Sequence, residues 1–259
     1  MEIVFKIVIC FFAGAGAGIG TGFAGMSAAG IISPMLIAFL DMPAYQAVAI
    51  GLLSDVLASA VSAWTYKRHG NLDIKNSIVL ISCVLGITIL GSFIARFVPD
   101  RTMNGTIQVA LIIIGLRFIL KPVTTTREQM EMQDRKSRII KSVIGGCFVG
   151  FICGFIGAGG GMMLLFMLTS VLGYEMHMAV GTSVFIMAFT ALTGGVSHLI
   201  IGETPDIFCL VLCIVFTFIW ARIAAVIANR ASSKTLNRVA GVVMIVTSAV
   251  VLFVNYVLK

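Results

Sequence analysis

Two glycine-rich runs interrupt long apolar stretches of the sequence, and hydroxyl side chains follow each run. A glycine break in an apolar helix exposes the backbone N–H groups that begin the next half-helix, and these groups attract anions. Hydroxyl groups add hydrogen-bond donors that suit an oxyanion. The alternative is that the glycines only allow close helix packing. The residues that we predict to bind a small anion are Gly25, Ser27, Ser33, Gly157, Gly159, Gly160, Gly161, Thr182 and Ser183.

Asp55 is a carboxylate in the middle of the apolar segment 44–66. An ionisable side chain this deep in an apolar span is costly, and such residues usually mark functional sites. Asp55 is therefore a candidate for coupling transport to protons, or it pairs with a basic group. The alternative is a neutral, structural carboxyl that is hydrogen-bonded to Ser54 or Ser59.

The composition indicates a membrane protein. Hydrophobic residues make up 59% of the chain and charged residues 11%, whereas soluble domains carry about 25% charged residues. Several runs exceed the ~18 uncharged apolar residues that mark a bilayer span. The net charge of +7 is concentrated beside these runs, which is typical of orientation signals rather than of a nucleic-acid surface. We expect an all-α polytopic protein of a bacterial plasma membrane, surrounded by lipid and without a nucleic-acid partner.

The remaining reactive side chains do not form a catalytic or metal-binding group. Cys209 and Cys213 share a helix face, but no histidine or carboxylate is spaced to complete a metal site with them. The three histidines are scattered, and no nucleophile is paired with a base. Glu175 and His177 lie in a short turn that we expect to be solvated, and Arg117 is expected to extend to the interface. We expect no enzyme activity, no cofactor and no metal.

The two halves of the chain repeat each other. Residues 6–70 align without a gap with residues 132 positions further on, and past one inserted residue the offset becomes 133. Asp73 and Asp206 are equivalent under the second offset, whereas Met187 stands at the position equivalent to Asp55. We therefore divide the chain into a first transmembrane repeat (1–120), a cytoplasmic linker (121–137) and a second transmembrane repeat (138–259).

Each repeat begins with an uncharged stretch that is too long for one straight span. Between Lys6 and Asp41 lie 34 such residues, and between Lys141 and Glu175 lie 33. Either stretch would extend about 50 Å as a helix, against a hydrocarbon core of about 30 Å. Each is therefore predicted to form two half-length helices that meet at a glycine break, as a re-entrant hairpin or two short crossings. Three ordinary spans follow in each repeat, predicted at 44–66, 77–98 and 104–120 and at 178–200, 207–228 and 237–257.

The charges beside two equivalent turns predict how the repeats are oriented. Lys67, Arg68 and Lys75 flank the turn at 70–73, whereas the turn at 202–206 carries two acids and no base. Inverted repeats would place the two turns in opposite compartments, with the basic one in the cytoplasm. Parallel repeats remain the alternative, because the total count of positive charges fits both. We predict inverted repeats, with the linker inside the cell and both termini outside.

The glycine motifs resemble those of the TauE/SafE family of anion exporters, the sulfite exporter type. The second repeat carries Gly157-Ala-Gly-Gly-Gly161 and then Ala179-Val-Gly-Thr-Ser183, and the first carries the turn Gly70-Asn-Leu-Asp73. In the first repeat, serine and alanine stand where the family pattern has glycines. The resemblance covers nearly the whole chain and implies transport of sulfite, an organosulfonate or a related organic oxyanion.

Together these features predict a secondary transporter, an exporter of a small anion. No phosphate-loop motif for nucleotide binding occurs, so we expect a gradient to drive transport, with protons as candidate coupling ions. A passive anion channel is the alternative, because glycine breaks also occur in channel filters, and a membrane-embedded enzyme is a second alternative. The sequence indicates no particular oligomeric state.

Overall fold

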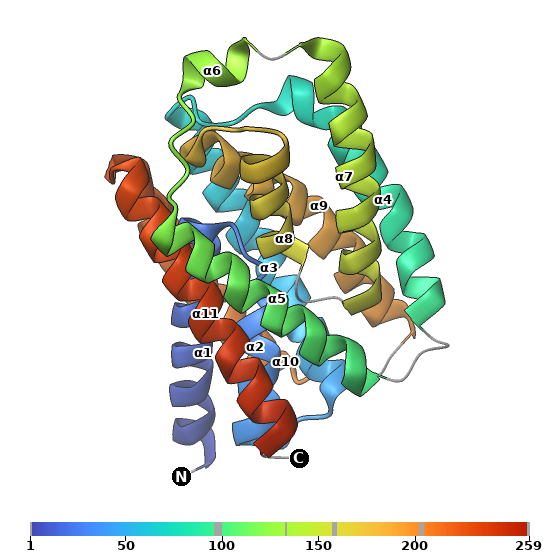
Figure 1. Cartoon of the computed structure of the whole chain (residues 1–259). Helices are drawn as coiled ribbons and strands as arrows, with labels where there is room; N and C mark the ends of the chain where they lie inside the picture. The colour runs from blue at the N-terminus through green and yellow to red at the C-terminus, as the bar shows by residue number, and fades with distance from the viewer. Residues whose placement is uncertain (1, 96–99, 133, 157–159, 202–204, 258–259) are drawn as a thin grey trace.

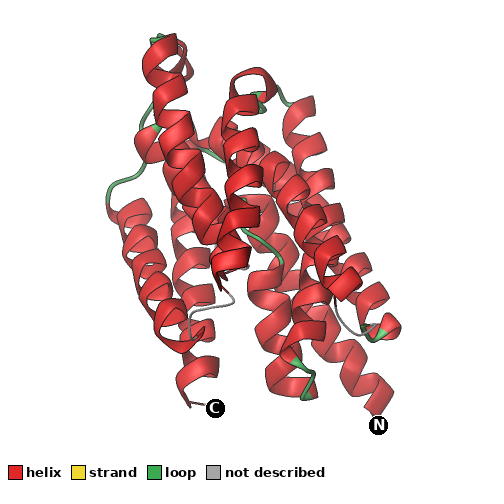
Figure 2. Ribbon diagram, turned by 90° about the vertical axis from the view of Figure 1, so that its right-hand side faces the viewer, coloured by secondary structure: helices red, strands yellow, loops and turns green. Residues whose placement is uncertain are grey.

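The chain folds into a bundle of helices that run roughly along one long axis (Figure 1, Figure 2). The structure, a computed structural model, describes residues 2–95, 100–132, 134–156, 160–201 and 205–257, and no strand occurs among these residues. Helices are the expected solution for apolar spans, because a bilayer offers no water to unpaired backbone groups.

The described residues of the first half form five helices, which begin and end close to the predicted positions. The uncharged stretch is divided in two, because the helix stops at Ala24 and a new one starts at Ala29. The three ordinary spans follow. The helices are α1 (Glu2–Ala24), α2 (Ala29–Leu40), α3 (Ala44–Arg68), α4 (Ile74–Ala95) and α5 (Asp100–Leu120).

The second half follows the same order after a short linker helix, α6 (Arg127–Glu131). One helix stops at Ile156 and the next described residue, Gly160, begins another. A π-helical segment, η1, continues this short helix. The elements are α7 (Arg135–Ile156), α8 (Gly160–Phe166), η1 (Met167–Val171), α9 (Met176–Ile201), α10 (Ile207–Arg230) and α11 (Ser233–Val257).

The lengths of these helices agree with a protein that crosses the membrane several times. Within the described residues, α1, α3, α9, α10 and α11 are each long and apolar enough to span a bilayer. The outward face of α10 is an apolar stripe with a period of four residues. Its members are Val211, Val215, Ile219, Ile223 and Ile227, all more than 40% exposed in the isolated chain. This stripe is suited to contact with lipid.

Helices from the two halves pair with each other in a reciprocal pattern. Helix α1 of the first half packs on α10 of the second, and α7, the counterpart of α1, packs on α4 of the first. The equivalent helices α3 and α9 pack on each other, and so do α5 and α11. Helix α3 and its equivalent α9 run antiparallel to each other, because Gly194 contacts Leu52 while Gly181 contacts Tyr66. Helices α3 and α9 lie at the centre, where 61% of their apolar windows is buried.

The charged loops gather at one end of the bundle. Helix α6 lies at this end, and the start of α1 and the end of α11 lie at the other (Figure 1). The turn after α3 belongs to the α6 end, since Asn71 donates a hydrogen bond to Asn229 at 2.8 Å. Asn237 at the start of α11 accepts one from the backbone of Val123 in the linker at 2.9 Å. We call this the linker end of the bundle.

Two equivalent ion pairs join the halves at opposite ends. At the linker end, Arg138 Nη2 lies 3.1 Å from Asp73 Oδ2, and at the other end Lys6 Nζ lies 2.8 Å from Asp206 Oδ2. The repeat offsets relate Lys6 to Arg138 and Asp73 to Asp206. The hydrogen bond from Lys6 holds the pKa of Asp206 below its ordinary value. The first pair therefore joins α7 to the residue just before α4, and the second joins α1 to the residue just before α10.

The turn that contains Glu175 and His177 is not solvated, so that expectation was wrong. The two side chains are only 16% and 13% exposed, because the loop between α10 and α11 folds over them. His177 Nδ1 lies 2.8 Å from Glu175 Oε1, and its Nε2 lies 3.1 Å from the carbonyl oxygen of Ala231. Burial favours the neutral carboxyl, but the hydrogen bonds from His177 outweigh it and hold the pKa of Glu175 below its ordinary value.

Candidate functional site

The break between α1 and α2 is closed over by protein and leaves the start of α2 without a side-chain cap. Gly25 has a φ of 61°, a left-handed conformation that favours glycine, and its N–H still bonds to Thr21 O at 3.0 Å. Ala28 occupies the N-cap position and offers no side-chain acceptor. The first N–H groups of a helix carry partial positive charge, so an anion at this point would be stabilised.

The second half contributes directly to this break. A Cβ atom added to Gly161 in α8 would lie 2.7 Å from Gly25 O and 2.9 Å from Ser27 N. A Cβ atom on Gly25 would clash with the hydroxyl of Ser183 in α9. The structure thus brings together four of the predicted residues, Gly25, Ser27, Gly161 and Ser183.

Other predicted residues lie further away or outside the described chain. Ser33 lies on the adjoining part of α2, where its hydroxyl donates to Ala47 O at 3.2 Å. Thr182 points to the linker end and accepts a hydrogen bond from Asp73 N at 3.3 Å. Gly160 packs against Cys153. Gly157 and Gly159 lie outside the described residues.

Asp55 lies beside the break, a position that the sequence alone did not indicate. Its side chain is fully buried, and Ser59 donates a hydrogen bond to Oδ1 at 2.7 Å. The other carboxylate oxygen has no hydrogen-bond partner among the described residues, and the same is true of the Ser27 hydroxyl. The carboxyl interacts with the Ser27 hydroxyl and with the backbone N–H of Ala28, although the Ser27 hydroxyl makes no hydrogen bond of full geometry.

The packing of α2 on α3 explains why Asp55 reaches the start of α2. The two helices form a tight hairpin in which Ala29 contacts Gly51 and Ser33 contacts Ala47. One further turn of this antiparallel pairing brings Ser27 to Asp55. The short helix before the turn at 41–43 and the long span after it are both visible in the sequence. Their antiparallel pairing could therefore have placed Asp55 beside the break.

The fold and this site define a multi-pass integral membrane protein whose central helices carry buried polar groups, which is the arrangement of a membrane transporter. The model of the family described as "Sulfite exporter TauE/SafE" matches residues 10–251, and the chain belongs to this family.

Similar proteins are described as transporters. "Probable membrane transporter protein YunE" of Bacillus subtilis (strain 168) is 23% identical over 95% of each chain. "Probable membrane transporter protein YdhB" of the same organism is 26% identical over 82% of this chain and 86% of that protein. A probable membrane transporter protein of Haemophilus influenzae is 26% identical over 76% of this chain and 75% of its own length. No solved structure matches the chain.

Proposed function

We propose that the protein is a secondary transporter of a small anion, which binds where the break between α1 and α2 meets α8 and α9. The observation that carries the proposal is the buried, unpartnered Ser27 hydroxyl beside the uncapped start of α2. An anion at this place would receive the hydroxyl and backbone N–H groups without a buried cation. The family points to sulfite, an organosulfonate or a related oxyanion as the substrate and to export as the direction.

Counterflow in proteoliposomes tests this proposal. Vesicles that contain the purified protein and unlabelled sulfite should accumulate labelled sulfite transiently, and taurine or another sulfonate should compete if it is a substrate. We expect a saturable initial rate, because each cycle requires one bound anion. A rate that rises linearly with concentration and no counterflow would indicate a channel, and chemical conversion of the substrate would indicate an enzyme.

We further propose that the two halves are inverted repeats. The equivalent ion pairs at opposite ends of the bundle support this arrangement, as does the antiparallel packing of α3 on α9. An inverted pair of repeats places one substrate site between the halves, and rocking of one half against the other exposes it to each side in turn. The linker end, which carries most of the positive charge, would face the cytoplasm.

Accessibility labelling should place Lys67 and Glu203 on opposite sides of the membrane. Single cysteines at these positions in a cysteine-free protein are treated with a membrane-impermeant maleimide in intact cells and in inverted vesicles. Lys67→Cys should react only in inverted vesicles, together with the linker control Glu128→Cys, and Glu203→Cys only in cells. Reaction of all three from one side would mean that the repeats are parallel.

Asp55 is our candidate for coupling anion transport to protons. An ionised carboxylate beside the start of α2 would repel an anion, whereas a protonated one could donate a hydrogen bond to it. A proton and an anion would therefore bind together and leave together. The unpartnered oxygen of Asp55 and the nearness of its carboxyl to Ser27 support this proposal.

Replacement of Asp55 by asparagine should remove the pH dependence of transport while the protein remains folded. Asparagine keeps the shape and cannot titrate, so initial rates across pH 5 to 8 should become nearly flat. Ser27→Ala is the matched control: it keeps the acid and removes one hydrogen bond of about 1 kcal/mol, so affinity should fall about fivefold with the pH response intact. A full pH response in Asp55→Asn would exclude this residue as the coupling site.

A further inference from the structure

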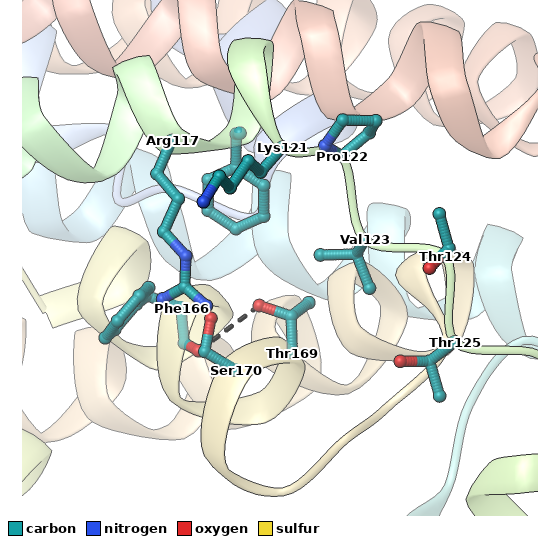
Figure 3. A pocket seen from close by; sticks show the side chains of 10 residues that line it. Arg117, Lys121, Pro122, Val123, Thr124, Thr125, Phe166, Thr169 and Ser170 are labelled. Carbon is teal, nitrogen blue, oxygen red and sulfur yellow. Dashed lines mark hydrogen bonds between the residues drawn. The ribbon is translucent and has the colours of Figure 1, made fainter.

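A polar cavity lies at the linker end, away from the break. Its volume is about 280 Å³. It is partly open to the outside and is lined by the end of α5, the first residues of the linker, Phe166 of α8 and η1. Figure 3 shows Arg117 and Lys121 reaching into it from one side and the hydroxyl-bearing Ser170 facing them from η1. Thr124 and Thr125 of the linker complete its polar wall.

The charges in this cavity are of one sign. Arg117 and Lys121 lie one helical turn apart, since Lys121 N bonds to Arg117 O at 2.7 Å. No carboxylate is among the residues that line the cavity, and neither base takes part in an ion pair within the described part of the chain. Two uncompensated positive charges that share one small cavity repel each other, so an anion between them would relieve the repulsion.

The arginine packs against an aromatic ring. Its guanidinium carbon lies 5.2 Å from the centre of the Phe166 ring, a cation–π contact that orients the planar group. A guanidinium fixed in this way can donate two parallel hydrogen bonds to an oxyanion, which a freely moving side chain would do at a greater cost in entropy. The simple expectation that Arg117 only extends to the interface does not account for this contact.

The far wall of the cavity has an unusual backbone. Thr169 and Ser170 belong to the π-helical segment η1, and such segments often occur at functional sites. The Thr169 hydroxyl donates within its own helix, to Leu165 O at 2.8 Å. The Ser170, Thr124 and Thr125 hydroxyls are therefore the donors that would complement the two bases.

The cavity also breaks the repeat. When the offset of 133 is continued, Val250 stands in the place of Arg117, and α2 has no π-helical segment where the first half corresponds to η1. A basic side chain and a π-helical segment that only stabilised the repeated fold would be expected in both halves. Among the described residues, the arginine and the π-helical segment have no equivalents in the other half, which points to a role specific to the linker end.

We propose that this cavity is a second anion site, which binds a sulfate-like or phosphate-like oxyanion group between Arg117, Lys121 and the surrounding hydroxyls. The group belongs either to a free oxyanion or to the headgroup of an anionic lipid, which share this chemistry. The proposal concerns binding alone and does not depend on transport through the break.

Equilibrium dialysis with labelled sulfate tests the free anion. The purified protein in a neutral detergent should bind sulfate saturably, and Arg117→Gln/Lys121→Gln should weaken binding at least about tenfold, because two charge-assisted contacts are lost. The control Arg127→Gln/Lys136→Gln removes two charges from exposed linker positions of the same end and should bind like the wild type.

Native mass spectrometry of the same proteins with phosphatidylglycerol tests the lipid. Bound lipid that is retained by the linker control and lost in Arg117→Gln/Lys121→Gln would support the site and assign it to a headgroup. Sulfate binding with the same pattern would support the site and assign it to a free anion. Failure of both probes to bind, or equal loss in the two double variants, would overturn the proposal.

Discussion

Replacement of Gly161 by alanine should nearly abolish transport. The added Cβ atom would lie 2.7 Å from Gly25 O, 2.9 Å from Ser27 N and 3.0 Å from the Cα atom of Met26. All three atoms belong to the backbone of the break, so no side-chain rotation can relieve the overlap. Overpacking of this kind costs about 1–3 kcal/mol, and α8 would have to move away from the start of α2.

The measurement is the initial rate of counterflow in proteoliposomes that contain equal amounts of folded protein. We expect a fall of about tenfold or more, since each 1.4 kcal/mol lost from the bound state weakens affinity about tenfold. Gly86→Ala is the matched control, because it makes the same change in α4 where a Cβ atom would meet nothing within 4 Å. A wild-type rate in Gly161→Ala would mean that contact between the halves at this break is not required for transport.

Two features of the sequence predicted the elements of the fold. One is the length of the charge-free stretches, and the other is the internal repeat. Charge-free stretches that are longer than the bilayer is thick must be divided, and α1 and α2 meet at Gly25 as the glycines indicated. The repeat offsets also contained the two equivalent ion pairs, since they relate Lys6 to Arg138. Recognition of these pairs needed only the additional rule that opposite charges at the ends of packed helices attract each other.

The neighbours of the candidate site could not be predicted in the same way. Asp55 reaches the break through the packing of α2 on α3, and Arg117 contacts Phe166 across the two halves. Such contacts depend on which helix faces meet, and apolar helices in a membrane carry little amphipathic pattern that would reveal the face. For the same reason Glu175 and His177 appeared solvated although a distant loop covers them.

Removal of the Arg138 side-chain charge should strongly destabilise the protein, whereas the equivalent change at Lys6 should have little effect. Arg138 and Asp73 are 12% and 10% exposed, and Tyr174 donates a further hydrogen bond to Asp73 Oδ2 at 3.1 Å. Loss of one partner from a buried pair leaves an uncompensated charge and costs about 3–5 kcal/mol. Lys6 and Asp206 are 40% and 28% exposed, and such pairs contribute about 0–1 kcal/mol.

The comparison uses Arg138→Met, Asp73→Asn, their double variant and Lys6→Met, with stability measured by titration with denaturing detergent. Arg138→Met should lower the free energy of unfolding by about 3 kcal/mol or more. The double variant should lose less than the sum of the two single changes, because no charge is then left unpaired. Equal losses of stability in Arg138→Met and Lys6→Met would show that the buried ion pair contributes no more to stability than the exposed one. If the buried pair contributes more, the two halves are held together more strongly at the linker end. The opposite end is then the one that separates first.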